Sequence, residues 1–222
     1  MSIQVVLFDF DGTLADTLPL SFHAFKAVFK QYDNRDVTND ELIAMFGPTE
    51  EGIISDNFRD KASVPQAIHD YYSLYEQGHY DSSLSDQAII DLLQFLKEQN
   101  VKIGVITGKS RRAFHVSSEA LHLLHFFDIA ITGDDVEKAK PDPEGIFKAL
   151  DTLGIHQSEA VFVGDSNADI LAGMAAGIRT YGVQWLSTSQ SLVYDVLPDR
   201  IFMRVADFRE LLAEEIVFHR SR

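Results

Sequence analysis

The pattern of apolar and polar positions divides the chain into two parts with different periods. Residues 3–8 form an apolar run rich in β-branched side chains, which is typical of a strand buried on both faces. From residue 85 onward, short apolar runs alternate with amphipathic stretches of helical period. Strands are expected at 102–106, 129–131, 160–163 and 179–182, with an edge strand at Phe202, and helices at 88–97, 111–124, 143–153, 167–176 and 208–216. This alternation predicts an α/β fold with a doubly wound parallel sheet and right-handed crossovers.

The segment between the first strand and residue 84 has the helical period alone. Its apolar residues recur three and four positions apart, and no run has the character of a strand. Thr38 and Glu41 have the spacing of a capping box at the start of a helix. Helix-breaking residues divide the segment at 32–34, 47–49, 64–65 and Gly78. We predict an all-helical domain over 16–83, inserted into an α/β core domain formed by 1–15 and 84–222.

The composition is that of a globular protein. The 222 residues are 45% hydrophobic and 24% charged, and a chain of this length can bury a substantial core. No apolar run approaches the ~20 residues that cross a bilayer, and Met1-Ser2 leads directly into the first strand without the segments of a secretory signal. The absence of cysteine excludes disulfides and thiolate metal sites and fits a reducing cytoplasm. We expect a cytoplasmic protein, with no membrane partner.

The chain is strongly acidic, with 19 Lys and Arg against 34 Asp and Glu and a formal net charge of −15. This balance argues against nucleic acid or an anionic membrane as a partner. It also means that a site for an anionic substrate must be locally positive, because the protein as a whole repels anions. We expect a small-molecule partner and a monomer or homodimer.

Polar residues follow the predicted strands where each strand ends. Asp9 and Asp11 come at the end of the first strand, Thr107 follows the second, Lys140 comes in the loop after the third, and Asp165 follows the fourth. The carboxyl ends of parallel strands meet at one edge of the sheet, and ligands bind at that edge. An ordinary Asp-Gly turn would explain Asp11 but not Asp9. We therefore expect these five side chains to converge.

Such a convergence favours phosphate chemistry with a metal ion. The carboxylates of Asp9, Asp11 and Asp165 around one point suit a hard cation with oxygen ligands, which is how Mg²⁺ is usually held. Lys140 and Thr107 add an ammonium and a hydroxyl for a bound oxyanion. A phosphate dianion would still leave excess negative charge, so one carboxylate that keeps a proton would suit the site and act as a general acid.

Four segments in this order resemble the motifs of the haloacid dehalogenase (HAD) superfamily of phosphatases. Residues 9–14 resemble its first motif, 107–108 its second, 140–143 its third and 164–169 its fourth. The resemblance covers the whole chain and implies a Rossmann-like core. The position of the helical segment, between the first and second motifs, resembles the small helical cap of the family. The residues within the motifs are most similar to those of phosphoglycolate-phosphatase-like members.

The resemblance implies a two-step hydrolysis of a small phosphate monoester. Asp9 would attack phosphorus and form an aspartyl-phosphate. Asp11 would protonate the leaving oxygen and then activate water. Mg²⁺ would be held by the carboxylates of Asp9 and Asp165 and by the backbone carbonyl of Asp11. Thr107 and Lys140 would hold the phosphoryl oxygens.

Further residues are implied as supports. Asp169 would orient the metal-bound waters or the lysine of the third motif, and Thr13 would tune the general acid. The loop at 47–52 resembles the cap loop that selects the substrate. Residues expected to contact the substrate are Thr13, Thr49, Gly108 and Lys109.

Alternatives within and outside the family stay open. Asp11 argues against a dehalogenase, because dehalogenases of this superfamily lack the second carboxylate of the first motif. Sugar phosphomutases resemble the chain, but they carry a histidine where this chain has Ser21, and often a valine where it has Thr13. An inorganic-pyrophosphatase-like member shares the same motifs and is not separated from the leading interpretation. A non-catalytic binding module on this fold would have lost a motif residue, and none is lost.

Two local assignments also depend on alternatives. Lys138 competes with Lys140 for the ammonium role, and the proline after Lys140 favours Lys140 because it fixes the adjacent backbone. Asp16 is interpreted as the N-cap of the first helix of the insert.

Overall fold

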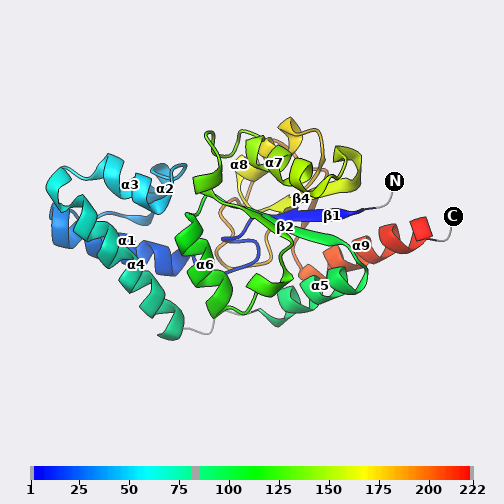
Figure 1. Ribbon diagram of the computed structural model, residues 1–222, viewed down its shortest axis with the longest axis horizontal. Helices are drawn as coiled ribbons and strands as arrows, with labels where there is room; N and C mark the ends of the chain where they lie inside the picture. Colours follow the sequence, from blue (N-terminus) through cyan, green and yellow to red (C-terminus); the bar gives the residue numbers. More distant parts are fainter. Residues whose placement is uncertain (1–2, 82–85, 221–222) are drawn as a thin grey trace.

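The chain folds as a parallel sheet with helices on both faces and a group of helices beyond one end of the strands (Figure 1). The computed structural model describes residues 3–81 and 86–220. The strands are β1 (Val5–Phe8), β2 (Lys102–Ile106), β3 (Ile129–Ile131), β4 (Ala160–Gly164), β5 (Arg179–Val183) and β6 (Arg200–Phe202). The helices are α1 (Leu18–Asp33), α2 (Asn39–Ala44), α3 (Glu50–Asn57), α4 (Val64–Asp81), α5 (Gln87–Glu98), α6 (Arg111–Ala120), α7 (Glu144–Leu153), α8 (Asn167–Ala175) and α9 (Val205–Arg220).

The six strands lie in the order β3-β2-β1-β4-β5-β6, and every neighbouring pair is parallel. The predicted doubly wound parallel sheet is therefore confirmed. The strand order reverses between β1 and β4, and ligands bind outside the carboxyl ends of the strands at such a switch point. The fold thus directs the ends of β1 and β4 toward one place.

Alternate residues of the strands face two separate layers of helices. Val6 and Phe8 of β1 pack in a cluster with residues of α5 and α9, whereas Val5 and Leu7 pack in a second cluster with residues of α7 and α8. Figure 1 shows these two pairs of helices on opposite sides of the sheet. Because both faces are covered, the central strands β1 and β4 are apolar and buried along their whole length, which is why the sequence marks them clearly.

Helices α1–α4, here called the helical insert, pack around a hydrophobic cluster of their own. Aromatic side chains dominate it, with the rings of Phe25 and Tyr71 at 4.5 Å and those of Phe29 and Phe58 at 4.8 Å. The capping box predicted at Thr38 and Glu41 is present. The predicted boundary between residues 83 and 84 lies outside the described residues, and the division into two domains stays a prediction.

Three local predictions were wrong. The helix expected over 111–124 ends at Ala120, where His122 turns the chain with φ +57°. Gly78 lies inside α4, where the missing side chain lets Leu20 of α1 pack closely; a Cβ would lie 3.0 Å from Leu20 Cδ2. Thr17 takes the N-cap position of α1, and Asp16 instead accepts a hydrogen bond from Ser187 Oγ at 2.9 Å.

The helical insert contacts α6 through hydroxyl groups as well as apolar side chains. Tyr72 and Tyr75 of α4 form hydrogen bonds with Ser110 at 2.8 Å and Ser117 at 2.6 Å. His79 is buried beside them; its Nε2 lies 3.1 Å from Ser117 Oγ, and its Nδ1 has no hydrogen-bond partner among the described residues. Burial, with the charge of Lys109 acting in the same direction, lowers the pKa of His79 to about 4.

None of the described helices combines the length and the apolar character needed to cross a membrane.

The lowered pKa of His79 predicts a dependence of stability on pH. Between the ordinary histidine pKa of about 6.5 and the native value of about 4, the unfolded chain binds a proton that the native state does not. The free energy of unfolding should therefore fall as the pH falls through this window. In His79→Phe that contribution is absent, so urea unfolding at pH 7 and pH 5 should show a smaller loss than in the wild type. Equal losses in the two proteins would contradict the assignment.

Candidate active site

The turn after β1 sets the position of the first two aspartates. The backbone N–H of Asp9 donates to the carbonyl of Val163 at 2.8 Å, so the pairing of β1 with β4 continues to this residue. Gly12 has φ +80°, a conformation that favours glycine. A Cβ at Gly12 would lie 2.3 Å from Oδ2 of Asp165. Glycine therefore allows both the turn and the close approach of Asp165 to the first motif.

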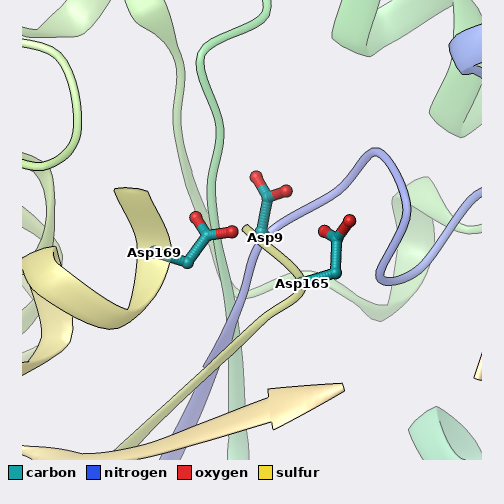
Figure 2. A group of neighbouring side chains, drawn as sticks. All are labelled: Asp9, Asp165 and Asp169. Atoms are coloured by element: carbon teal, nitrogen blue, oxygen red, sulfur yellow. The ribbon is translucent and has the colours of Figure 1, made fainter. Parts of the chain in front are cut away.

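Three buried carboxylates converge at this edge of the sheet. Asp9, Asp165 and Asp169 each place a carboxylate oxygen within 4.8 Å of the others. Figure 2 shows the three side chains, which come from the end of β1, the end of β4 and the first turn of α8. The residues alone predicted Asp9, Asp11 and Asp165 as the carboxylates of the site. In the structure, Asp169 joins Asp9 and Asp165 in this group, whereas the Asp11 carboxylate is not part of it. The contact between a metal ion and the backbone carbonyl of Asp11 stays a prediction.

The Asp11 carboxylate is held by two donors at the edge of a cavity. Its oxygens accept a hydrogen bond from Thr17 Oγ1, just before α1, and lie 3.2 Å from Nζ of Lys109. Both partners come from outside the first motif, one from the start of the helical insert and one from the loop after β2. Asp11 thus contacts both parts of the chain.

Lys140 lies between two of the three grouped carboxylates. Its Nζ donates to Asp9 at 2.6 Å, to Asp169 at 2.6 Å and to the carbonyl of Ile106 at 3.0 Å. Burial acts to lower the pKa of Lys140, but the charges of Asp169 and Asp9 outweigh it and raise the pKa above its usual range. Lys138, the competing candidate, is largely exposed and lies 3.8 Å from Asp142. The geometry therefore favours Lys140 as the ammonium of the site.

The site carries more negative than positive charge. Burial, with the charges of Asp169 and Asp11, raises the pKa of Asp9 to about 7 despite the opposing effect of Lys140. Burial and the charge of Asp9 raise the pKa of Asp165 well above its usual range. Buried carboxylates with one ammonium between them are costly without a further cation. An all-oxygen donor set with excess negative charge fits a hard divalent ion such as Mg²⁺.

Asp165 is positioned by groups from both ends of the chain. Its two oxygens accept hydrogen bonds from Thr13 Oγ1 at 2.9 Å and from the backbone N–H of Gln190 at 2.7 Å. Trp185 Nε1 donates to the Thr13 carbonyl at 2.8 Å and so ties the loop after β5 to the first motif. Thr13 therefore contacts Asp165 rather than the general acid that it was expected to tune. The sequence did not point to Gln190, because a hydrogen bond from a backbone N–H does not depend on the type of residue.

Asp169 has a structural role as well. Its second oxygen accepts hydrogen bonds from Ser166 N at 3.0 Å and Ser166 Oγ at 2.6 Å, which completes a capping box at the start of α8. Its first oxygen binds Lys140. A Cβ at Gly164 would lie 2.4 Å from the Asp169 Cβ, so this glycine makes room for the arrangement. The expectation that Asp169 orients Lys140 fits these contacts.

Lys109 links the core to the helical insert. Its Nζ lies 3.7 Å from Oε1 of Glu50 on α3 and 4.8 Å from the centre of the Tyr75 ring on α4, in addition to its contact with Asp11. Burial acts to lower the pKa of Lys109, but Asp11, the nearby tyrosines and Glu50 together raise it well above the usual range. Thr107, also buried, accepts a hydrogen bond from the Lys109 N–H at 3.2 Å. Lys109 therefore stays charged and internally paired.

The loop before α3 rests directly on the core. Thr49 caps α3 by accepting a hydrogen bond from Gly52 N at 3.4 Å, and it is not among the residues that line the cavity. A Cβ at Gly133 would lie 2.7 Å from Thr49 Cγ2 and 2.6 Å from the carbonyl oxygen of Gly108. The loop after β3 thus needs glycine where the helical insert meets it.

A cavity of about 190 Å³ lies between the ends of the strands and the helical insert. This volume is below the range of typical drug-sized pockets, about 300–1,000 Å³, and suits a small metabolite. The core contributes Asp9, Asp11, Thr107, Gly108, Lys109, Ala139, Lys140, Ser166, Ala168 and Gln190, and the helical insert contributes Leu18, Ser21, Phe25, Phe46, Gly47, Pro48, Glu50 and Ile53. Of the predicted substrate contacts, Gly108 and Lys109 line the cavity, and Thr13 and Thr49 do not.

Comparison with known proteins gives one family and consistent relatives. Residues 6–183 match the family described as haloacid dehalogenase-like hydrolase. Pyrophosphatase PpaX of Bacillus cereus (strain AH820) is 31% identical over 217 residues, which covers 96% of this chain and 98% of that protein. Pyrophosphatase PpaX of Anoxybacillus flavithermus is 34% identical over 215 residues, with the same coverage.

Solved structures share the fold. A haloacid dehalogenase-like family hydrolase of Streptococcus pneumoniae is 27% identical, with a TM-score of 0.72 over 96% of this chain and 98% of that one. CbbY of Rhodobacter sphaeroides, solved in complex with phosphate, has a TM-score of 0.81 over 93% of this chain and 96% of that one. Because CbbY is 22% identical, its likeness bears on the fold alone.

The close packing at Gly133 predicts a cost for adding a methyl group. In Gly133→Ala the new Cβ would meet the backbone of Gly108 and the side chain of Thr49, and overpacking of this kind costs about 1–3 kcal/mol. Urea unfolding should show this loss. Gly108→Ala is the matched control, since a Cβ at Gly108 meets no atom within 4 Å and should change the stability little. Equal stabilities of the two variants would contradict the packing described.

Proposed function

The chain belongs to the haloacid dehalogenase-like hydrolases, and from this premise we propose that it is a Mg²⁺-dependent phosphatase that hydrolyses a small phosphate monoester through an aspartyl-phosphate. The observation that carries the proposal is the placement of Asp9. Its carboxylate lies on the cavity wall, in contact with Lys140 and grouped with Asp165 and Asp169. A nucleophile, a cation for phosphoryl oxygens and a metal-binding donor set thus meet at one point.

The donor set supports a role for Mg²⁺. The carboxylates of Asp9 and Asp165 would hold the ion together with the backbone carbonyl of Asp11. Bound there, it would offset the charge of the phosphoryl oxygens and of the carboxylates that surround them. Thr13 and the Gln190 N–H would keep Asp165 in position through the hydrogen bonds that its oxygens accept.

The reaction divides between Asp9 and Asp11. In the first step an oxygen of Asp9 forms a bond to phosphorus, the bond from phosphorus to the leaving oxygen breaks, and that oxygen takes a proton from Asp11. In the second step Asp11 takes a proton from water, the water oxygen attacks phosphorus, and Asp9 is released with inorganic phosphate. Thr17 and Lys109 orient Asp11 for both proton transfers.

Lys140 and Thr107 would hold the phosphoryl group during transfer. Lys140 stays charged at neutral pH because two carboxylates raise its pKa. Its ammonium can therefore offset negative charge on the equatorial oxygens, and the Thr107 hydroxyl adds a hydrogen bond. The helical insert would act as the cap, which closes the cavity and excludes bulk water from the aspartyl-phosphate.

Pyrophosphate hydrolysis is the second candidate, because relatives of 31% and 34% identity are named pyrophosphatases. The two reactions share the core residues, so the cap side of the cavity decides between them. A mutase is less well supported, since Ser21 lines the cavity at the position where the mutases resembled here carry histidine. A binding module is less well supported, because Asp9, Asp11, Thr107 and Lys140 are all retained and line the cavity.

Metal removal tests the role of the carboxylate group. Excess EDTA should abolish hydrolysis of p-nitrophenyl phosphate, because the buried carboxylates would then repel the phosphoryl group, and Mg²⁺ should restore it. Ca²⁺ should fail to restore it, since its larger and looser coordination shell misplaces the attacking carboxylate. EDTA saturated with Mg²⁺ is the control. Full activity in excess EDTA would contradict the metal assignment.

Substitution of the two aspartates tests covalent catalysis. Asp9→Asn should keep the fold and bind phosphate but lose several orders of magnitude in kcat, because an amide does not attack phosphorus. Asp11→Asn should react slowly with a good leaving group and accumulate phosphoryl-enzyme, since no base then activates water. Rapid quenching with ³²P-labelled substrate measures this intermediate. An active Asp9→Asn variant with no phosphoryl-enzyme in any form of the protein would refute the mechanism.

A further inference from the structure

The helical insert gives the cavity a wall that is largely apolar. Most of the side chains that it contributes are hydrocarbon, and this group consists of Leu18, Phe25, Phe46, Pro48 and Ile53. Its polar side chains on the wall are Ser21, which accepts a hydrogen bond from Tyr71 at 3.2 Å, and Glu50. In the proposed reaction the phosphoryl group occupies the core end at Asp9, so the leaving group contacts this wall.

Glu50 gives that wall a fixed negative charge. It is buried at the start of α3, where Oε2 accepts a hydrogen bond from the backbone N–H of Ser110 at 2.8 Å and Oε1 lies 3.7 Å from Lys109. These contacts with the core keep the Glu50 carboxylate facing the cavity between the core and the helical insert. A second carboxylate or phosphate on the substrate would be brought close to this like charge.

Among the described residues that line the cavity, no free cation is available to compensate a second negative charge on the substrate. Their positive side chains are Lys109 and Lys140, and both belong to the core. Lys140 contacts Asp9, Asp169 and a backbone carbonyl at the core end, and in the proposed reaction it serves the phosphoryl group there. Lys109 lies between Asp11 and Glu50. A doubly anionic substrate would therefore place its second charge beside apolar carbon and Glu50.

We propose that the substrate is the phosphate monoester of a small, uncharged and partly apolar alcohol, and that Glu50 and the apolar wall reject leaving groups that carry a carboxylate or a phosphate. The inference rests on the proposed phosphatase function and narrows it. It excludes phosphoglycolate and pyrophosphate as preferred substrates, although both are substrates suggested by the resemblance or by the names of relatives. The cavity volume of about 190 Å³ favours a small alcohol.

A matched pair of substrates tests the inference. Ethyl phosphate and phosphoglycolate have the same carbon skeleton and differ in a methyl group against a carboxylate. We expect kcat/KM for ethyl phosphate to exceed that for phosphoglycolate by more than about tenfold. Glu50 shares the single ammonium of Lys109 with Asp11, so the added carboxylate of phosphoglycolate would lie near excess negative charge, which costs more than about a factor of ten in affinity. Propyl phosphate should be better than ethyl phosphate, because it covers more of the apolar wall. A higher kcat/KM for phosphoglycolate or pyrophosphate would overturn the inference.

Two neighbouring glutamates provide a matched pair of variants. Glu50→Gln removes the charge from the cavity wall and should reduce the preference for ethyl phosphate over phosphoglycolate several-fold. Glu51→Gln removes the same charge from an exposed side chain that accepts a hydrogen bond from Tyr72 at 3.3 Å and does not line the cavity. It should leave the preference unchanged. Equal effects of the two substitutions, or none from Glu50→Gln, would overturn the role of Glu50.

Equilibrium binding separates failure of this inference from failure of the proposed function. Calorimetry with Mg²⁺ and the Asp9→Asn variant should rank ethyl phosphate above phosphoglycolate, and this ranking needs no turnover. If p-nitrophenyl phosphate is hydrolysed in an Asp9-dependent way and phosphoglycolate still binds more tightly, the substrate class is wrong and the phosphatase assignment stands. If no phosphate ester is hydrolysed, the phosphatase assignment fails, and the same binding order decides the preference of the cavity.

Discussion

The structure depends on how it compensates buried negative charge at the ends of β1 and β4. Asp9, Asp165 and Asp169 lie within 4.8 Å of one another, and Lys140 donates to two of them. One ammonium does not balance three buried carboxylates, and burial together with the neighbouring carboxylate charges raises the pKa values of Asp9 and Asp165. A divalent cation would offset the excess, so the feature that is costly for folding is also the one that would suit the site to a metal ion and phosphate.

Much of the surrounding backbone serves to hold this cluster in place. Gly12 and Gly164 have no side chain that would clash with Asp165 and Asp169, respectively. The loop after β5 adds donors from a distant part of the chain, the Gln190 N–H to Asp165 and the Trp185 indole to the first motif. These contacts fix the directions of the carboxylates, and a catalytic site needs such fixed directions more than it needs additional charge.

The helical insert contacts the same group of charged residues. Lys109 contacts Asp11 of the core and Glu50 of the insert, so a single buried ammonium joins the proposed general acid to the wall that faces the leaving group. An anionic leaving group would compete with both carboxylates for this cation. In the proposed reaction the core would bind the phosphoryl group through charge, and the helical insert would bind the rest of the substrate largely through apolar contact.

The sequence by itself determined the fold class and the residues at the strand ends. The central strands β1, β2 and β4 carry apolar runs that are buried on both faces, and the polar residues that follow them stand out at Asp9, Thr107 and Asp165. Local patterns failed where a distant segment decided the outcome: Gly78 continues α4 because Leu20 packs against it, and Asp16 pairs with Ser187 instead of capping α1. The resemblance implied a supporting role for Asp169 and a substrate-facing loop at 47–52, but only the tertiary structure grouped the Asp169 carboxylate with Asp9 and Asp165 and put the Glu50 side chain on the cavity wall. The positions of these side chains depend on their directions and on packing between segments far apart in the chain. The hydrophobic period of the sequence contains no information about either.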